Sequence, residues 1–154
     1  MAKQLFLVFF IGKEQFAINT QDVIEILPLV NFTQIPKTEN YVAGMMNFRG
    51  IMTPAIDLCM LVNQQSFQEK VCSRIIVIRN PFSAEFNYTG LIAEKVTNTL
   101  TLETDNFISH GLIKNNTRYL GSIAQVDSNE IQIIDLEKLL PDEVNNQPFA
   151  NSIG

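Results

Sequence analysis

The segment "GMMNFRGIMTPAIDL", from Gly44 to Leu58, determines how the rest of the chain is interpreted. A bend is expected at Gly44, and Gly50 is expected to form a corner with positive φ or to let two strands approach closely. The apolar residues after Gly50 predict a strand over 51–58, in which Pro54 lacks an N–H donor for the sheet. The segment therefore predicts β-structure that carries one cation, Arg49.

Three explanations of Arg49 follow from its residue type. It could be a clamp in an active site, a buried structural ion held by a carboxylate such as Glu25 or Asp57, or an exposed contact for another protein. A buried arginine without a partner is very costly, so the second explanation requires one of those carboxylates. The third fits the five rigid donors of the guanidinium, and arginine beside apolar residues is common at interfaces. Because no catalytic set is evident, the residues favour the third.

The sequence on either side predicts further short strands. Residues 4–19 indicate a hairpin, residues 73–80 a buried strand, and residues 88–102 a strand followed by an alternating segment. A second hairpin is expected to turn at residues 127–130. Many short strands with Gly and Pro turns and few helices indicate an all-β barrel or sandwich.

Helical turns are predicted where a capping side chain precedes a short apolar run. Thr20 or Asp22 is expected to cap a single turn, and Asp57 a brief helix over "LCMLVN". Asp135 is expected to cap a last helix that Pro141 closes. These helices are too short to alter the all-β fold class.

Two parts of the chain resemble each other faintly. The segments "PAIDLCMLV" and "IQIIDLEKLL" both contain a strand, Ile-Asp-Leu and a short helix. The segments "FAINTQDVIEIL" and "YTGLIAEKVTNTL" match loosely as well. Two similar small barrels within one domain would explain both matches.

Length and charge limit the classes of protein. The chain has 154 residues and a formal net charge of −5, so one domain over 1–142 is expected, followed by a disordered tail over 143–154. An acidic chain without a basic stripe is a poor binder of nucleic acid and of anionic membrane. No signal-like start and no long apolar run is present, so a cytoplasmic protein without membrane insertion is predicted.

The sequence also lacks the usual motifs of catalysis. The single histidine, His110, is expected in a loop, the two cysteines have no metal-binding spacing, and the acidic residues are scattered. No catalytic residue, metal site or cofactor is predicted. Two rival classes remain open. One is a small-molecule-binding or enzymatic β-barrel, and the other is an oligonucleotide-binding barrel, which the negative charge and the lack of Trp disfavour.

The blocks "FLVFFIGKEQFAINTQDVIEIL", "IPKTENYVAGMMNFRGIMTPAIDL", "TGLIAEKVTNTL" and "IIDLEKLL" together resemble the CheW family of bacterial chemotaxis coupling proteins, from Gln4 to Leu140. The resemblance implies two intertwined five-stranded SH3-like β-barrels with short helices. It also implies a non-catalytic cytoplasmic adaptor that bridges methyl-accepting chemoreceptors and the regulatory domain of a CheA-type histidine kinase, recruited to receptor arrays at the inner membrane.

The resemblance also implies roles for individual residues. The partner-binding positions fall on Val23, Glu25, Ile26 and Arg49, and the structural motif positions on Gly44, Asn47, Gly50, Asp57, Gly90 and Val96. Three residues depart from the family pattern: Phe48 replaces leucine in Asn-Leu-Arg-Gly, Glu94 replaces aspartate, and Cys59 stands where a basic residue is common.

Overall fold

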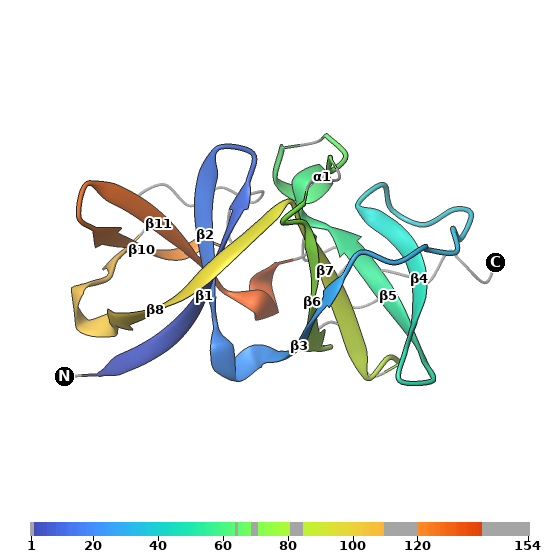
Figure 1. Ribbon diagram of the computed structural model, residues 1–154, viewed down its shortest axis with the longest axis horizontal. Helices are drawn as coiled ribbons and strands as arrows, with labels where there is room; N and C mark the ends of the chain where they lie inside the picture. Colours follow the sequence, from blue (N-terminus) through green and yellow to red (C-terminus); the bar gives the residue numbers. More distant parts are fainter. Residues whose placement is uncertain (1, 64, 69–70, 81–84, 110–119, 140–154) are drawn as a thin grey trace.

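The computed structural model describes residues 2–63, 65–68, 71–80, 85–109 and 120–139. The predicted tail 143–154, His110 and Pro141 lie outside these residues. Figure 1 shows two β-sheets side by side along the long axis of the molecule. The first sheet contains β1 (Lys3–Ile11), β2 (Glu14–Asn19), β8 (Lys95–Glu103), β9 (Ile108–Ser109), β10 (Leu120–Val126) and β11 (Asn129–Ile134). The second contains β3 (Val23–Pro28), β4 (Val42–Phe48), β5 (Ile51–Asp57), β6 (Arg74–Arg79) and β7 (Tyr88–Ala93).

The two sheets have the same topology. The strand orders are β8-β1-β2-β11-β10-β9 and β3-β6-β7-β5-β4. Each sheet has one parallel pair, β2 with β11 and β5 with β7, in the same place in the order. Each half of the chain, β1–β5 and β6–β11, contributes its first hairpin to one sheet and its later strands to the other. The chain crosses from one sheet to the other at β3 and again at β8 (Figure 1). The all-β fold with two intertwined five-stranded units is confirmed, and β9 adds a two-residue sixth strand to the first.

The internal repeat extends to irregularities of the strands. The register skips Thr97 between β1 and β8, and it skips Ile24 at the equivalent place between β6 and β3. A second pair of bulges skips Ala43 between β4 and β5 and Gly121 between β10 and β11. Bulges bend a strand and increase its twist. The two halves therefore curl their sheets in the same way.

The apolar side chains of the described residues form three clusters, one inside each sheet and one between the sheets. Phe6 and Val8 lie inside the first sheet, whereas Leu7 and Phe9 face the second. The strand β6 alternates in the same way between the interior of its own sheet and the shared cluster. Burying one such side chain contributes about 1.5–3 kcal/mol. Both faces of the central strands are therefore buried against other apolar side chains.

Gly44 lets the chain pass close beside β4. Thr33 exchanges two backbone hydrogen bonds of 2.8 Å with Met45, which places residue 33 alongside the outer strand of the second sheet. Gly44 has φ +148°, and a Cβ there would lie 2.7 Å from the Thr33 carbonyl oxygen. A side chain at position 44 would therefore collide with the backbone that flanks β4.

Buried carboxylates hold the loops at one end of the shared cluster. Asp57 caps α1 (Leu58–Asn63), because its Oδ1 accepts N–H groups from Cys59 (3.0 Å) and Met60 (3.2 Å), and its Oδ2 accepts that of Phe67 (3.0 Å). Burial raises the pKa of Asp57, and these hydrogen bonds oppose the rise. Glu94 accepts the N–H of Gly12 (3.1 Å) and that of Gln68 (2.7 Å). The predicted cap at Asp57 is confirmed.

Other predicted caps need correction or refinement. The turn η1 (Thr20–Asp22) is capped by Asn19, whose Oδ1 accepts the N–H of Gln21 at 2.9 Å, and not by Thr20 or Asp22. Asn19 has the extended backbone that an N-cap requires, whereas Thr20 and Asp22 are already part of the turn. Asp135 does cap the last turn, but η3 (Leu136–Lys138) is a single 3₁₀ turn. A further 3₁₀ turn, η2 (Thr104–Asn106), connects β8 to β9.

The turns η1 and η3 bring three carboxylates together where the two halves meet. Asp22, Asp135 and Glu137 line a hollow of about 430 Å³, with Arg79 also in its wall. Burial raises the pKa of Asp22, and the negative charges of Glu137 and Asp135 raise it further. The protonated form of Asp22 is therefore favoured by folding.

Gly44→Ala should destabilise the protein by about 1–3 kcal/mol, because the new Cβ would meet the Thr33 carbonyl in a backbone conformation that L-residues rarely adopt. Gly121→Ala is the matched control, since its Cβ would meet no atom closer than 3.7 Å. Urea unfolding of both variants measures the difference. Equal stability of Gly44→Ala and the parent would contradict this explanation of the glycine.

Asp22→Asn should raise the free energy of unfolding at pH 7 by about a few tenths of a kcal/mol, since solvent screens this exposed group. Asp22 does not destabilise the folded state below its unfolded pKa of 3.8, because the group is then protonated in both states. The destabilisation develops as the pH rises from 3.8 through the raised folded pKa. The gain should therefore disappear on acidification. Thermal melts against pH test this, with Asp105→Asn in η2 as control. A gain that persists below pH 3.8 would show that it does not come from the desolvated and repelled Asp22 charge.

Candidate partner-binding site

A tight turn carries Arg49 at the end of the β4–β5 hairpin. Arg49 and Gly50 have φ values of +53° and +80°, the signs of the two-residue turn that best fits a twisted hairpin. The Asn47 Oδ1 accepts the N–H of Gly50 at 2.8 Å. Asn and Gly are the usual residues of such turns, and a left-handed conformation costs other residues about 1–2 kcal/mol. The turn itself therefore gives no reason for an arginine at position 49.

The Arg49 side chain is exposed and held at two points. Its Nη2 forms an ion pair with the Glu25 Oε1, and its Cζ lies 4.8 Å from the centroid of the Phe48 ring. The side chains of Arg49 and Glu25 are 58% and 37% exposed. A pair as exposed as this contributes at most about 1 kcal/mol to stability. Of the three explanations, the structure shows the exposed arginine, with Glu25 and not Asp57 as its partner.

The ion pair joins the two edges of the second sheet. Glu25 lies on β3 and Arg49 follows β4, and these strands are the first and last of that sheet. The guanidinium therefore lies where the sheet curls toward closure, beside backbone groups at the sheet edges. Such edges are common places for contact with another chain.

The bulge in β3 puts Val23 and Ile26 on the same face. Val23 pairs with Ile78 and Ile26 with Ile76, and both isoleucines belong to the cluster between the sheets. Val23 packs against that cluster, and Ile26 is 42% exposed. Glu25 pairs with Val77, which faces the interior of the second sheet. Val23 and Ile26, three residues apart in the sequence, therefore lie on one apolar face beside the junction of the two sheets.

The other half of the chain offers equivalent positions with different chemistry. Val96 pairs with Phe9 on β1 as Val23 pairs with Ile78 on β6, and it also packs against the shared cluster. The positions equivalent to Glu25 and Arg49 are Asn98 and Asp127. Asp127 has φ +56°, so even the turn is repeated. The frame has approximate two-fold symmetry, whereas the guanidinium occurs at one of its two turns.

The remaining predicted residues belong to the frame. A Cβ on Gly90 would lie 2.8 Å from the Ile75 Cγ2 inside the second sheet, so the glycine leaves room for core packing. Gly44 and Asp57 have the roles described above. The structure thus brings together Arg49, Glu25, Asn47 and Gly50. It packs Val23 and Val96 against the shared cluster, with Ile26 exposed on the same face as Val23, and keeps Gly44, Asp57 and Gly90 inside the frame.

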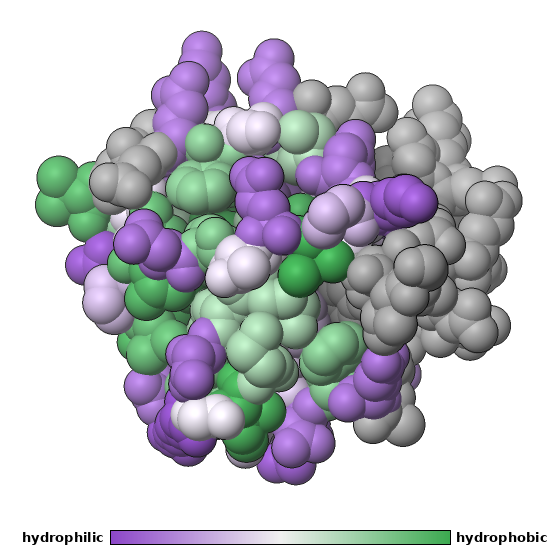
Figure 2. Space-filling view, turned by 90° about the vertical axis from the view of Figure 1, so that its right-hand side faces the viewer, coloured by the Kyte–Doolittle hydropathy of each residue, from purple (hydrophilic) through white to green (hydrophobic). Residues whose placement is uncertain are grey.

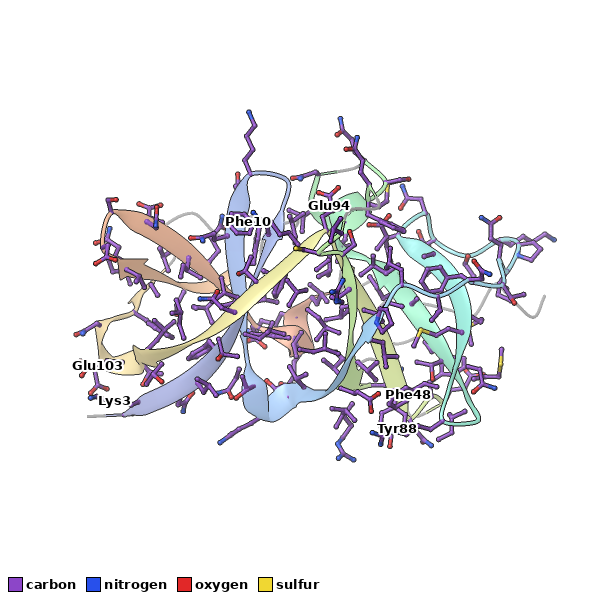
Figure 3. All side chains as sticks on the ribbon, viewed as in Figure 1. Lys3, Phe10, Phe48, Tyr88, Glu94 and Glu103 are labelled. Atoms are coloured by element: carbon purple, nitrogen blue, oxygen red, sulfur yellow. The ribbon has the colours of Figure 1, made fainter. Side chains whose placement is uncertain are left out.

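Residues near Arg49 that sequence reasoning did not select complete the surface. Tyr88 meets Phe48 edge to face, with ring centroids 5.2 Å apart (Figure 3). Met52, opposite Asn47 in the hairpin, is 53% exposed. Figure 2 shows the end of the molecule formed by the second sheet, where apolar side chains gather in the middle with polar ones interspersed among them and above and below. This composition is typical of protein interfaces. Only the strand register, which the sequence does not fix by itself, could have revealed Tyr88.

Metal-ligand clusters and membrane-spanning helices are both absent from the described part of the chain. Within the described ranges, no cluster of three or more His, Cys, Asp or Glu side chains could hold a metal ion. Burial raises the pKa of the Cys59 thiol to about 12, so the thiol stays protonated at neutral pH, and Cys59 and Cys72 are both free. Among the same residues, no helix is long and apolar enough to span a membrane.

Comparisons with known proteins agree with this architecture. The sequence matches the family model of the CheW-like domain over residues 5–144. It is 28% identical over 144 residues to the chemotaxis protein CheW of Klebsiella aerogenes, covering 91% of this chain and 83% of that protein. It is 27% identical over 125 residues to CheW of Helicobacter pylori, covering 73% of each chain.

A solved structure shows the same fold. The crystal structure of the scaffolding protein TtCheW from Thermoanaerobacter tengcongensis superposes with a TM-score of 0.79 at 26% sequence identity. The match covers 90% of this chain and 88% of that one. The sequence match and the repeated, intertwined sheets lead to the same conclusion: the chain belongs to the family of CheW-like domains.

Proposed function

We propose that this chain is a non-catalytic adaptor of a bacterial chemosensory array. It would bridge methyl-accepting chemoreceptors and the regulatory domain of a CheA-type histidine kinase, and it would be recruited to receptor arrays at the inner membrane. The observation that carries the proposal is an exposed guanidinium in a left-handed turn, on a chain of the CheW-like family.

The conformation of Arg49 supports a role outside the fold. The turn would be more stable with Asn or Gly at this position, and the exposed ion pair with Glu25 returns little stability. An arginine retained in these conditions is explained if its donors serve a partner. Guanidinium groups bind carboxylates and backbone carbonyls in fixed geometry.

The surroundings of Arg49 suggest a division of roles. Ile26 and Met52 are exposed apolar side chains: Ile26 follows Glu25 on β3, and Met52 lies on β5, opposite Asn47 of β4. Val23 and Ile26 would supply apolar anchors, Arg49 a directional contact, and Glu25 the orientation of that contact. Faces of this modest size bind weakly one at a time and strongly when an array repeats them.

One feature favours a second candidate, a small-molecule-binding or enzymatic β-barrel. The hollow between η1 and η3 gathers Asp22, Asp135 and Glu137. Converging carboxylates of this kind can perform acid–base chemistry when one has a raised pKa, as Asp22 does.

The purified protein is expected to show no turnover of nucleotides, esters or phosphoesters above the rate of an Asp22→Asn variant. Adaptor function needs no reaction, whereas the second candidate requires the carboxylates of the hollow. Steady-state assays with the parent protein and this variant compare the two. Turnover that disappears in Asp22→Asn would support the enzymatic barrel.

Arg49→Ala should leave the melting temperature within about 4 °C of the parent, because the exposed pair is worth under about 1 kcal/mol. The same change should weaken binding of the CheA-type regulatory domain or of a receptor cytoplasmic fragment by about 5- to 100-fold, the range for an arginine at the centre of an interface. Calorimetry or a pull-down titration measures binding, and circular dichroism measures stability.

Lys37→Ala is the matched control for this experiment. Lys37 is also an exposed cation at positive φ, with φ +66°, so its removal changes charge and turn strain in a similar way at a different place. Binding should be unaffected. Equal losses in both variants would reduce the effect to net charge, and a collapsed melt with intact binding in Arg49→Ala would return Arg49 to a structural role.

A further inference from the structure

We propose that Phe48 and Tyr88 are positioning residues that fix the direction in which Arg49 is offered to its partner. The inference rests on the proposed function, since it adds to the role of Arg49 in binding. It assigns a task to two side chains that the resemblance to the family does not select, one of which replaces the leucine of the family pattern.

The first contact is between the guanidinium and a ring face. The Arg49 Cζ lies 4.8 Å from the Phe48 ring centroid, within the distance at which a cation is attracted by an aromatic quadrupole. Phe48 is only 2% exposed, so the core holds the ring and leaves little room for it to rotate. A leucine at this position would offer the cation no ring face.

The second contact fixes the plane of that ring. Tyr88, the first residue of β7, meets Phe48 at a centroid distance of 5.2 Å and an interplanar angle of 80°. Aromatic pairs prefer this edge-to-face geometry over a parallel sandwich. Tyr88 packs against the interior cluster of the second sheet. Figure 3 shows Phe48 and Tyr88 together at one end of that sheet. The ring plane, and with it the place of the guanidinium, thus depends on a strand that is distant in sequence.

The remaining contacts leave Arg49 few alternatives. Glu25 holds the Nη2 from β3, and Asn47 holds the backbone of the turn through the Gly50 N–H. Arginine is among the side chains with most rotamer freedom to lose. A guanidinium that is already ordered loses less of that freedom on binding, which strengthens the complex. The ring pair therefore acts through Arg49 and need not touch the partner.

The first test needs no partner. In NMR spectra of the free protein, the Arg49 side-chain protons should be shifted upfield by the Phe48 ring, and the shift should be lost in Phe48→Leu. Tyr88→Leu should move these signals toward the values of a flexible arginine, whereas Tyr88→Phe, which keeps the aromatic ring, should retain them. Arg74, whose Nη1 bonds the Val71 carbonyl at 2.8 Å, is the internal control. Arg49 signals of a flexible arginine in the parent protein would overturn the inference.

The second test is a double-mutant cycle, with the regulatory domain of a CheA-type kinase as the titrant. Tyr88→Leu should weaken binding by about two- to tenfold, the range expected for losing one pre-ordered side chain. In an Arg49→Ala background the same change should have no further effect. Independent, multiplying losses would overturn the inference, since Tyr88 would then act without Arg49. If thermal melting shows that Tyr88→Leu does not fold, Phe48→Leu replaces it in the cycle.

The two tests separate the inference from the proposed function. If the parent protein binds neither the regulatory domain nor a receptor cytoplasmic fragment, the proposed function fails, and the NMR shifts still decide whether the ring pair orders Arg49. If the parent binds and the cycle shows no coupling, the proposed function stands and the positioning role is wrong.

Discussion

The apolar cluster between the two sheets is the constraint on which the rest of the structure depends. The central strands β1 and β6 must be apolar on both faces, because one face lines their own sheet and the other lines the shared cluster. The exchange of β3 and β8 between the sheets ties the halves together covalently as well. Contacts with other molecules are therefore left to edge strands and turns, which is where Arg49 and Glu25 lie.

The frame is nearly symmetric, and the chemistry placed on it is not. Both halves share strand order, the parallel pair, both bulges and a left-handed residue in the same hairpin turn. The residues at equivalent positions differ, with Glu25 and Arg49 in one half and Asn98 and Asp127 in the other. A frame of this kind can present two related faces of different charge, which suits a protein proposed to connect two different partners.

Much of the fold could be predicted from the sequence, because strand signals and caps are local. The hairpins, the cap at Asp57 and the repeated Ile-Asp-Leu segments depend on neighbouring residues. The prediction of the η1 cap was wrong because Asn19, Thr20 and Asp22 can all act as N-caps, and only the backbone conformation selects one of them. The grouping of the site could not be predicted in the same way. Val23 and Ile26 share a face through a bulge, and Tyr88 reaches Phe48 through strand register, and both are properties of the assembled sheet.

The most direct test of the central claim is chemical-shift mapping of the ¹⁵N-labelled chain during titration with the regulatory domain of a CheA-type kinase or with a receptor cytoplasmic fragment. The proposed site predicts shifts concentrated in residues 23–26 and 47–50, with the core strands β1 and β6 unchanged. Saturable binding that leaves the Arg49 turn unperturbed and shifts residues elsewhere would contradict it.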